Sequence, residues 1–177
     1  MFLRVWARAA CALVLPLVMS PTASAHVTLA DKEAVVGSRY QAVLRVPHGC
    51  KGSPTIRLRV RVPEGVFNVK PQPKPGWTLE TVKGEYAKTY AFHGSQLTQG
   101  VKEVVWSGGR LSDEHYDEFV FVAYLSAELP AGSTLHFPVV QECEQGVERW
   151  IDVGGPNAAA AAAHADAPAP ALKLLAK

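Results

Sequence analysis

Apolar and polar side chains alternate along most of the chain, which is the pattern of half-buried β-strands. The clearest case is residues 55–62, where Ile56, Leu58, Val60 and Val62 occupy every second position and polar residues lie between them. Residues 40–46 and 119–125 alternate in the same way. Short apolar or alternating segments predict seven further strands, over residues 27–29, 66–69, 77–82, 86–92, 101–106, 134–141 and 147–152.

Turn-forming residues separate these segments. The chain has 177 residues with 13 prolines and 14 glycines, and many of them fall between the predicted strands. Many short strands joined by turns predict an all-β fold, an antiparallel two-sheet β-sandwich that is Ig-like or cupredoxin-like. Four of these turns are Pro63-Glu64-Gly65, Pro73-Lys74-Pro75-Gly76, Ser107-Gly108-Gly109 and Pro130-Ala131-Gly132.

The first 25 residues have the composition of a secretory signal peptide. Arg4 and Arg8 precede an apolar stretch over residues 9–19, and Ala23-Ser24-Ala25 matches the small-residue cleavage pattern. The apolar stretch is short for a membrane-spanning helix, although an uncleaved anchor is the alternative. We therefore expect cleavage after Ala25, a mature chain that begins at His26, and a periplasmic location.

The two ends of the chain are expected to lie outside the folded domain. We predict that residues 26–153 form the β-sandwich. Residues 154–177 begin with Gly154-Gly155-Pro156 and continue with an alanine run and an alanine-proline segment, which is typical of a flexible tail.

Cysteine usage is consistent with an oxidising compartment. Cleavage would remove Cys11 and leave Cys50 and Cys143. Two cysteines in an exported domain predict one disulfide, and free thiols are the alternative. Both methionines, Met1 and Met19, would also be removed, which leaves the mature chain without this soft ligand.

The charge balance gives no reason to expect a nucleic-acid partner. The chain has 18 basic residues, but Arg4 and Arg8 lie in the leader, so the mature domain has as many basic as acidic side chains. One local feature departs from this balance, a stripe of Arg57, Arg59 and Arg61 on the polar side of its strand. The stripe is either a solvated strand face or a docking patch for an acidic partner.

A histidine at a mature N-terminus has special metal chemistry. The α-amine of His26 and its imidazole Nδ1 can bind one ion as a chelate, because the α-amine has an intrinsic pKa near ~8. Nitrogen donors in a planar array favour Cu(II), which also heads the affinity order of the divalent ions. The sequence therefore predicts that the protein binds Cu(II) and that His26 is the first residue to coordinate the ion.

A third donor is needed beside the amine and the imidazole of His26. His48 is the first choice, because it follows a strand that could pair with the first strand and bring its end close to residue 26. His93, His115 and His136 are interpreted as ordinary surface or core histidines. A blue-copper site is not expected, because that site uses a thiolate and usually a methionine.

Several segments in order along residues 26–153 resemble the YcnI-like copper-binding domain family. These segments are His26-Val27-Thr28-Leu29, Arg45-Val46-Pro47, Val60-Arg61-Val62-Pro63-Glu64-Gly65-Val66, Pro71-Gln72-Pro73-Lys74-Pro75-Gly76-Trp77, Val105-Trp106-Ser107-Gly108-Gly109, Phe137-Pro138-Val139-Val140-Gln141 and Arg149-Trp150. The resemblance implies an extracytoplasmic β-sandwich that binds Cu(II) through a brace at its N-terminal histidine.

The resemblance also implies a glutamate ligand after the strand over residues 40–47 and a tryptophan close to the metal. Here His48 stands in place of the glutamate, which would give a brace with two histidines. Glu33 or another carboxylate is the alternative third ligand. For the tryptophan we favour Trp150, with Trp106 as the second choice, and either could instead be a packed core residue.

Three functions are compatible with these features. The first is a non-catalytic copper chaperone or buffer, whose partners would be a copper-transporting membrane protein or other periplasmic copper chaperones. The second is a histidine-brace oxidase or monooxygenase, although the chain has no evident platform of exposed aromatic residues for a substrate. The third is a metal-free Ig-like interaction module. We expect the first, and we expect no enzymatic activity.

Overall fold

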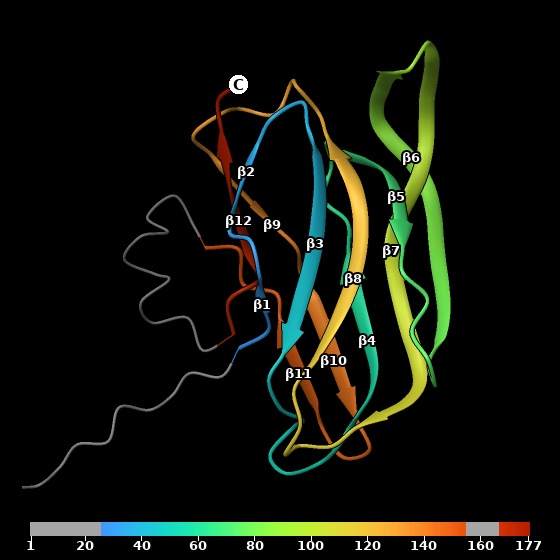
Figure 1. The fold of residues 1–177 in the computed structure, drawn as a ribbon, viewed down its shortest axis with the longest axis vertical. Coiled ribbons are helices and arrows are strands. Elements are labelled where there is room, and N and C mark those ends of the chain that lie inside the picture. Colours follow the sequence, from blue (N-terminus) through green and yellow to red (C-terminus); the bar gives the residue numbers. More distant parts are fainter. Residues whose placement is uncertain (1–25, 155–166) are drawn as a thin grey trace, which may run out of the picture.

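The computed structural model describes residues 26–154 and 167–177 (Figure 1). The predicted signal peptide lies outside the described residues, as does the alanine run of residues 155–166. The described residues form strands and turns without an α-helix, so the all-β prediction is confirmed. Within these residues there is no helix of the length and hydropathy that a membrane crossing requires.

The first sheet has four strands in the order β1-β3-β8-β5. The alternation predicted for β3 is confirmed, because Tyr40, Ala42, Leu44 and Val46 are all buried. In β8, Phe119, Phe121, Ala123 and Leu125 are buried as predicted. The strands are β1 (Thr28–Leu29), β3 (Arg39–Val46), β8 (Asp117–Leu125) and β5 (Val66–Pro71).

The second sheet has five strands in the order β11-β10-β4-β7-β6. Its strands are β11 (Val147–Trp150), β10 (Val139–Cys143), β4 (Thr55–Arg61), β7 (Ser95–Leu111) and β6 (Thr78–Phe92). The alternation holds for Leu58 and Val60 but fails at Ile56, which is only half-buried, while Thr55 is fully buried. A register irregularity between Thr55 and Arg57 changes which residues face inward.

Strands β6 and β7 form one long hairpin instead of the separate short strands that the sequence predicts (Figure 1). The hairpin turns at His93 and Gly94, both of which have positive φ angles, of 49° and 80°. A two-residue turn of this kind matches the twist of paired strands. The tip of the hairpin packs against β5, where the ring of Tyr90 stacks on Phe67 with 4.9 Å between centroids.

A third sheet joins segments that are far apart in the sequence. Its order is β2-β12-β9, with β2 (Glu33–Val35), β12 (Ala171–Leu175) and β9 (Thr134–His136). Strand β12 pairs with β2 in parallel and with β9 in antiparallel orientation, and Leu172 and Leu174 are buried. The prediction of a flexible tail over residues 154–177 is therefore wrong for residues 167–177. The two leucines alternate with Ala171 and Lys173, which is itself a strand pattern.

The sandwich core lies between the sheets. Its largest fully buried side chains are aromatic, and Phe137 reaches it from the segment between β9 and β10. The strand predicted over residues 134–141 is interrupted at this point, because Pro138 lacks the N–H group that would continue the pairing. Burial of each such phenylalanine contributes about 1.5 to 3 kcal/mol to folding.

Candidate metal site

The pairing of β1 with β3 brings the N-terminal residue toward the end of the neighbouring strand. Thr28 lies opposite Arg45, and Leu29 lies opposite Leu44. Because the strands are antiparallel, residues before Thr28 extend in the direction of residues after Arg45. The predicted pairing of the first strand with the strand of residues 40–47 is therefore confirmed, and His26 lies toward the end of β3 that leads into His48.

Trp150 is the tryptophan that lies against His26. The two ring centroids are 5.1 Å apart and the rings are nearly perpendicular, at 79°. Trp150 is the last residue of β11 and is 94% buried from solvent, since only 6% of its surface is exposed. Trp106, the second choice, is instead packed in the core with its ring 5.5 Å from Phe119, and its Nε1 donates to the backbone oxygen of Gln72.

A buried glutamine connects Trp150 to the segment that carries His48. The indole Nε1 of Trp150 donates to Oε1 of Gln141 over 3.0 Å. The Nε2 of Gln141 donates to the backbone oxygen of His48 and to Oγ1 of Thr55, each over 2.7 Å. Gln141 is only 1% exposed, so these contacts satisfy a polar side chain that would otherwise be costly to bury. The network fixes Trp150 and the His48 backbone relative to each other.

The predicted disulfide is present and lies beside this network. Cys50 is joined to Cys143 across a sequence separation of 93 residues. Closing a loop of this length stabilises the fold by about 4 to 5 kcal/mol in the chain-entropy description. Cys50 is two residues from His48, and Cys143 is two residues from Gln141. The crosslink therefore ties the His48 loop to β10 on the opposite sheet.

The loop after His48 is held by two further contacts. The backbone N–H of Gly49 donates to Oδ1 of Asp113 over 2.9 Å. Cys50 and Ser53 exchange two backbone hydrogen bonds around a tight turn. A Cβ atom at Gly49 would lie 1.9 Å from the backbone oxygen of Ser53, so no larger residue fits there without movement of the loop. The backbone that directly follows His48 is thus constrained.

The imidazole of His48 has a local contact that assigns its two nitrogens. Its Nδ1 lies 2.5 Å from the backbone oxygen of Gly49. Because a carbonyl oxygen can only accept a hydrogen bond, this contact requires the proton on Nδ1, and the neutral ring then has its lone pair on Nε2. Metal-binding histidines commonly donate their second ring N–H to a carbonyl or carboxylate in this way. The ring chemistry of His48 therefore suits coordination through Nε2.

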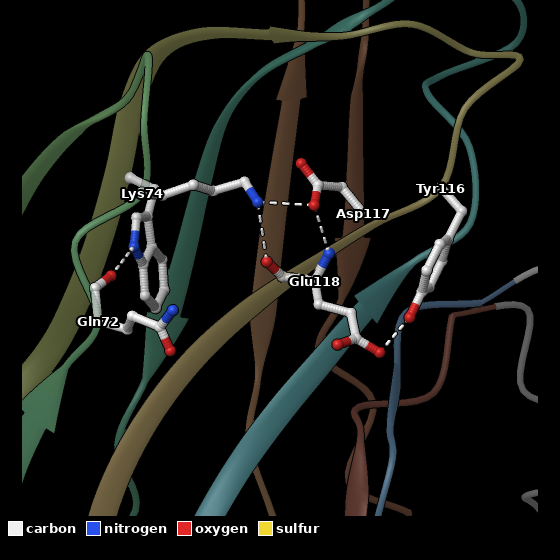
Figure 2. Close-up of polar contacts among 6 residues, drawn as sticks. Gln72, Lys74, Tyr116, Asp117 and Glu118 are labelled. Carbon is white, nitrogen blue, oxygen red and sulfur yellow. Dashed lines mark hydrogen bonds and ion pairs between the residues drawn. The ribbon is translucent and has the colours of Figure 1, made fainter.

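A second polar cluster fixes the start of β8, directly after the loop that carries Asp113. The Nζ of Lys74 donates to Oδ1 of Asp117 over 2.6 Å and to the backbone oxygen of Glu118 over 3.1 Å (Figure 2). The hydroxyl of Tyr116 donates to the Glu118 carboxylate, which also pairs with Arg45 on β3. The hydrogen bond from Tyr116 lowers the pKa of Glu118 below its usual value. These contacts hold the β8 end of the loop that contains Asp113.

The other candidate ligands lie elsewhere. Glu33 is on β2 and pairs with Lys173 on β12 over 3.6 Å. His93 is in the β6–β7 turn, His115 is exposed in the β7–β8 loop, and His136 is half-buried on β9. Within the described ranges, no group of three or more histidine, cysteine, aspartate or glutamate side chains could hold a metal ion. A brace needs only two such side chains, because its third donor is a main-chain amine.

The sequence did not identify Gln141 or Asp113 as parts of this site. Gln141 sits at an inward position of a predicted strand, and a polar residue at a core position requires hydrogen-bond partners. The inward position of Gln141 could therefore have identified it as a hydrogen-bonded core residue. Asp113 had no such signal, because its partner Gly49 lies on a different loop and only the tertiary structure brings the two together.

Comparison with known proteins places the chain in a family. The model of a family described as a domain of unknown function, DUF1775, matches residues 26–174. The chain belongs to the DUF1775 family. This family includes the YcnI-like copper-binding domains, which agrees with the resemblance noted from the sequence. The DUF1775 match extends through most of β12, consistent with a C-terminal strand that is part of the domain.

A solved structure confirms the fold class of this DUF1775 domain. It is an uncharacterized protein from Nocardia farcinica whose crystal structure reveals an immunoglobulin-like fold. It is 23% identical in sequence, with a TM-score of 0.58, and the match covers 85% of this chain and 98% of the other. The Ig-like β-sandwich prediction is confirmed. No curated protein matches the chain.

Proposed function

We propose that the protein is a periplasmic Cu(II)-binding protein that acquires, buffers or hands over copper without catalysing a reaction. The observation that carries this proposal is the contact of His26 with Trp150, together with the Gln141 hydrogen bonds that connect Trp150 to the His48 backbone. The donors would be the α-amine and Nδ1 of His26 and the Nε2 of His48. Three nitrogens in this combination suit Cu(II).

Family membership and the disulfide support the same function. The DUF1775 family includes copper-binding domains, and a buried disulfide is typical of exported proteins. Removal of residues 1–25 would create the amine on which the brace depends. The indole of Trp150 would cover one side of the His26 ring and limit the access of water, which favours retention of the ion over its reaction with oxygen species.

The test compares protein that begins at His26 with protein that carries a four-residue Gly-Ser-Gly-Ser extension before His26, because a two-residue extension would place the histidine third in the chain and create a different Cu(II) chelate. Cu(II) affinity is measured by competition with a chelator, and nitrogen coupling is measured by electron paramagnetic resonance. We expect three coupled nitrogens and at least tenfold tighter binding in the authentic form, because the extension replaces the amine with an amide. A tenfold change corresponds to about 1.4 kcal/mol. Equal affinity of the two forms would refute the brace.

A second measurement separates a carrier from an enzyme. Copper-loaded protein is supplied with a reductant and oxygen, and the release of peroxide is followed over time. We expect no more peroxide than the same total amount of copper produces in the presence of the extended variant. Sustained turnover that depends on His26 would contradict the non-catalytic role.

A further inference from the structure

The outer face of the five-stranded sheet is unusually apolar for a surface. Among the described residues there are five exposed large hydrophobic side chains, and four of them gather on or beside this face. Isolated exposed hydrophobic residues are normal, whereas a gathered group marks an interaction site. The four are Val82, Val147, Ile151 and Val153, with exposed fractions of 53%, 46%, 48% and 48%.

The strand register shows how these residues combine with the arginine stripe. Residues directly opposite each other on antiparallel strands point to the same face of the sheet. The register therefore defines rows that cross the sheet from β6 to β11. One row consists of Glu80, Val105, Arg59, Val140 and Arg149, and the next consists of Thr78, Ser107, Arg57, Glu142 and Val147. A third row begins with Val82, Glu103 and Arg61. It reaches the segment before β10 through a hydrogen bond from the N–H of Arg61 to the backbone oxygen of Pro138.

An open groove of about 680 Å³ crosses this face, with largely apolar walls. It is lined by Arg61, Lys102, Val82, Val140, Ile151 and Val153, among others. A second hollow of about 340 Å³ shares Arg61, Lys102 and Val153 with the groove. Apolar side chains interleaved with arginine are the composition of a protein interface, where arginine and exposed apolar area both contribute to binding.

The charges on this face are not fully balanced. Glu142 pairs with Arg57 over 3.9 Å and with Arg59 over 3.5 Å, and Arg59 also pairs with Glu103. Lys102 is paired with Glu64. Arg61 and Arg149 are exposed, and neither forms an ion pair within residues 26–154 and 167–177. These two arginines are the positive charges that an incoming carboxylate could meet without displacing an existing partner.

We propose that this face, defined by Arg61, Arg149, Val82, Val140, Ile151 and Val153, docks a partner protein that presents carboxylate and apolar side chains on one segment. The surface is independent of copper binding, although Arg149 precedes Trp150 on β11 and Ile151 follows directly after the strand. Because side chains alternate along a strand, the docking face lies on the opposite side of β11 from the indole that contacts His26. A docked partner would therefore contact the outer side of β11, while Trp150 contacts His26 from the inner side of the same strand.

The same charges argue against two other occupants. Face-to-face docking of two copies would bring Arg61 and Arg149 of both chains into one interface, where like charges repel. An anionic membrane surface would contact Glu80, Glu103 and Glu142 together with the arginines, and these carboxylates would repel it. A protein segment can instead place its own carboxylates beside the arginines and away from the glutamates. The apolar residues are also valine and isoleucine rather than the tryptophan, phenylalanine and leucine typical of membrane-surface binding.

The probe is a short synthetic peptide of alternating glutamate and valine, with a lysine–valine peptide as its control. Binding to the full protein is measured by fluorescence anisotropy at low and high salt, and the contact surface is mapped by amide chemical shifts. We expect the glutamate peptide to bind at low salt, with shifts confined to the groove-lining parts of β4, β6, β7 and β10, to β11 and to residues 151–153. Binding should weaken as salt rises, because the arginine contacts are exposed.

Variants make the test specific. The double change Arg61→Glu and Arg149→Glu should weaken binding at least tenfold, and Ile151→Ser should weaken it severalfold. Arg39→Glu, on β3 of the other sheet, is the matched control and should bind like the wild type. The substituted side chains are exposed, so folding is checked simply by circular dichroism.

Several outcomes would overturn the proposal. One is a glutamate peptide that fails to bind, or that binds the double variant and the Arg39→Glu control equally well. Another is a dimer in sedimentation experiments that Ile151→Asp dissociates, which would assign the face to a second copy. A third is arginine-dependent binding to phosphatidylglycerol vesicles with no binding of the peptide, which would assign it to a membrane.

Discussion

The side-chain amide of Gln141 donates a hydrogen bond to the backbone oxygen of His48, with 2.7 Å between the two atoms. The same amide accepts a hydrogen bond from the indole of Trp150 at its oxygen end. One side chain on β10 therefore sets the relative position of a proposed ligand and of the ring that contacts His26. Neither His48 nor Trp150 can shift alone without breaking one of these bonds.

Replacing Gln141 should damage both stability and copper binding. Gln141→Leu keeps the approximate volume but leaves the Trp150 N–H and the His48 oxygen without their partner. An unsatisfied buried group costs about 1 to 3 kcal/mol, so we expect a loss of this size in urea unfolding. In the folded variant the Cu(II) spectrum should change, because the His48 backbone is less constrained. Gln99→Leu, an exposed glutamine on β7, is the matched control and should alter neither property.

Removing the His48 imidazole should weaken copper binding more than tenfold, or by about 1.4 kcal/mol or more. The physical reason is the loss of one of three nitrogen donors, which should also remove one nitrogen coupling from the resonance spectrum. His48→Ala tests this, and His48→Glu should restore part of the affinity through a carboxylate. His115→Ala, an exposed histidine in the β7–β8 loop, is the control. An unaltered spectrum for His48→Ala would place the third donor elsewhere, and Glu33 would then be tested.

Strand β12 should contribute to the stability of the whole domain. Leu172 is fully buried, so Leu172→Ala should lower the free energy of unfolding by about 2 to 5 kcal/mol. Lys173→Ala on the same strand removes only an exposed pair with Glu33 and should cost about 1 kcal/mol or less. Denaturant unfolding followed by tryptophan fluorescence measures both. Equal, small effects of the two changes would indicate that β12 is not part of the cooperative unit.

His136 should make the fold sensitive to acid. Burial lowers the pKa of His136 below its ordinary value of 6.5, and Asp152 opposes this only in part. The unfolded chain therefore binds a proton more readily than the folded protein does. The stabilising contribution is present above pH 6.5 and is lost as the pH falls below it. His136→Gln should flatten this dependence when urea unfolding is compared at about pH 8 and about pH 5.

The control for this prediction is His115→Gln, because His115 is an exposed histidine in the β7–β8 loop. The informative quantity is the change in unfolding free energy between the two pH values. A general loss of stability lowers the unfolding free energy equally at the two pH values, so it cancels in this difference. A slope in His136→Gln that matches the wild type would show that other groups carry the acid sensitivity.

The predicted strands were most accurate where alternation was strict and both neighbours were regular. The strands that contain residues 40–46 and 119–125, β3 and β8, pair with each other over the whole of β3, and their alternate residues are buried as expected. The pattern failed at Ile56, because a register irregularity is a property of the strand pair and not of one segment. The strand predicted over residues 86–92 ends where β6 ends, but alternation did not show that the connection is only the two-residue His93-Gly94 turn, so the start of β7 at Ser95 was missed.

The proposed ligands could be selected from the sequence, but their surroundings could not. His26 was identified by its place after a cleavage pattern, and His48 by its place after a strand. Gln141 and Asp113 act through hydrogen bonds to segments 93 and 64 residues away. Contacts over such separations depend on the order of strands in the sheets, which local alternation does not specify.

The parallel pairing of β2 with β12 sets an order of events for the chain. Glu33 lies opposite Lys173, so the three-stranded sheet requires residues from near both ends of the domain. Pairings between distant segments form slowly, because the entropy of a long loop must be lost before the first stabilising contact forms. During synthesis, β2 has no partner until almost the entire domain has emerged. The three-stranded sheet would thus be the last of the three to close, after the segments of the two larger sheets are already available to pair.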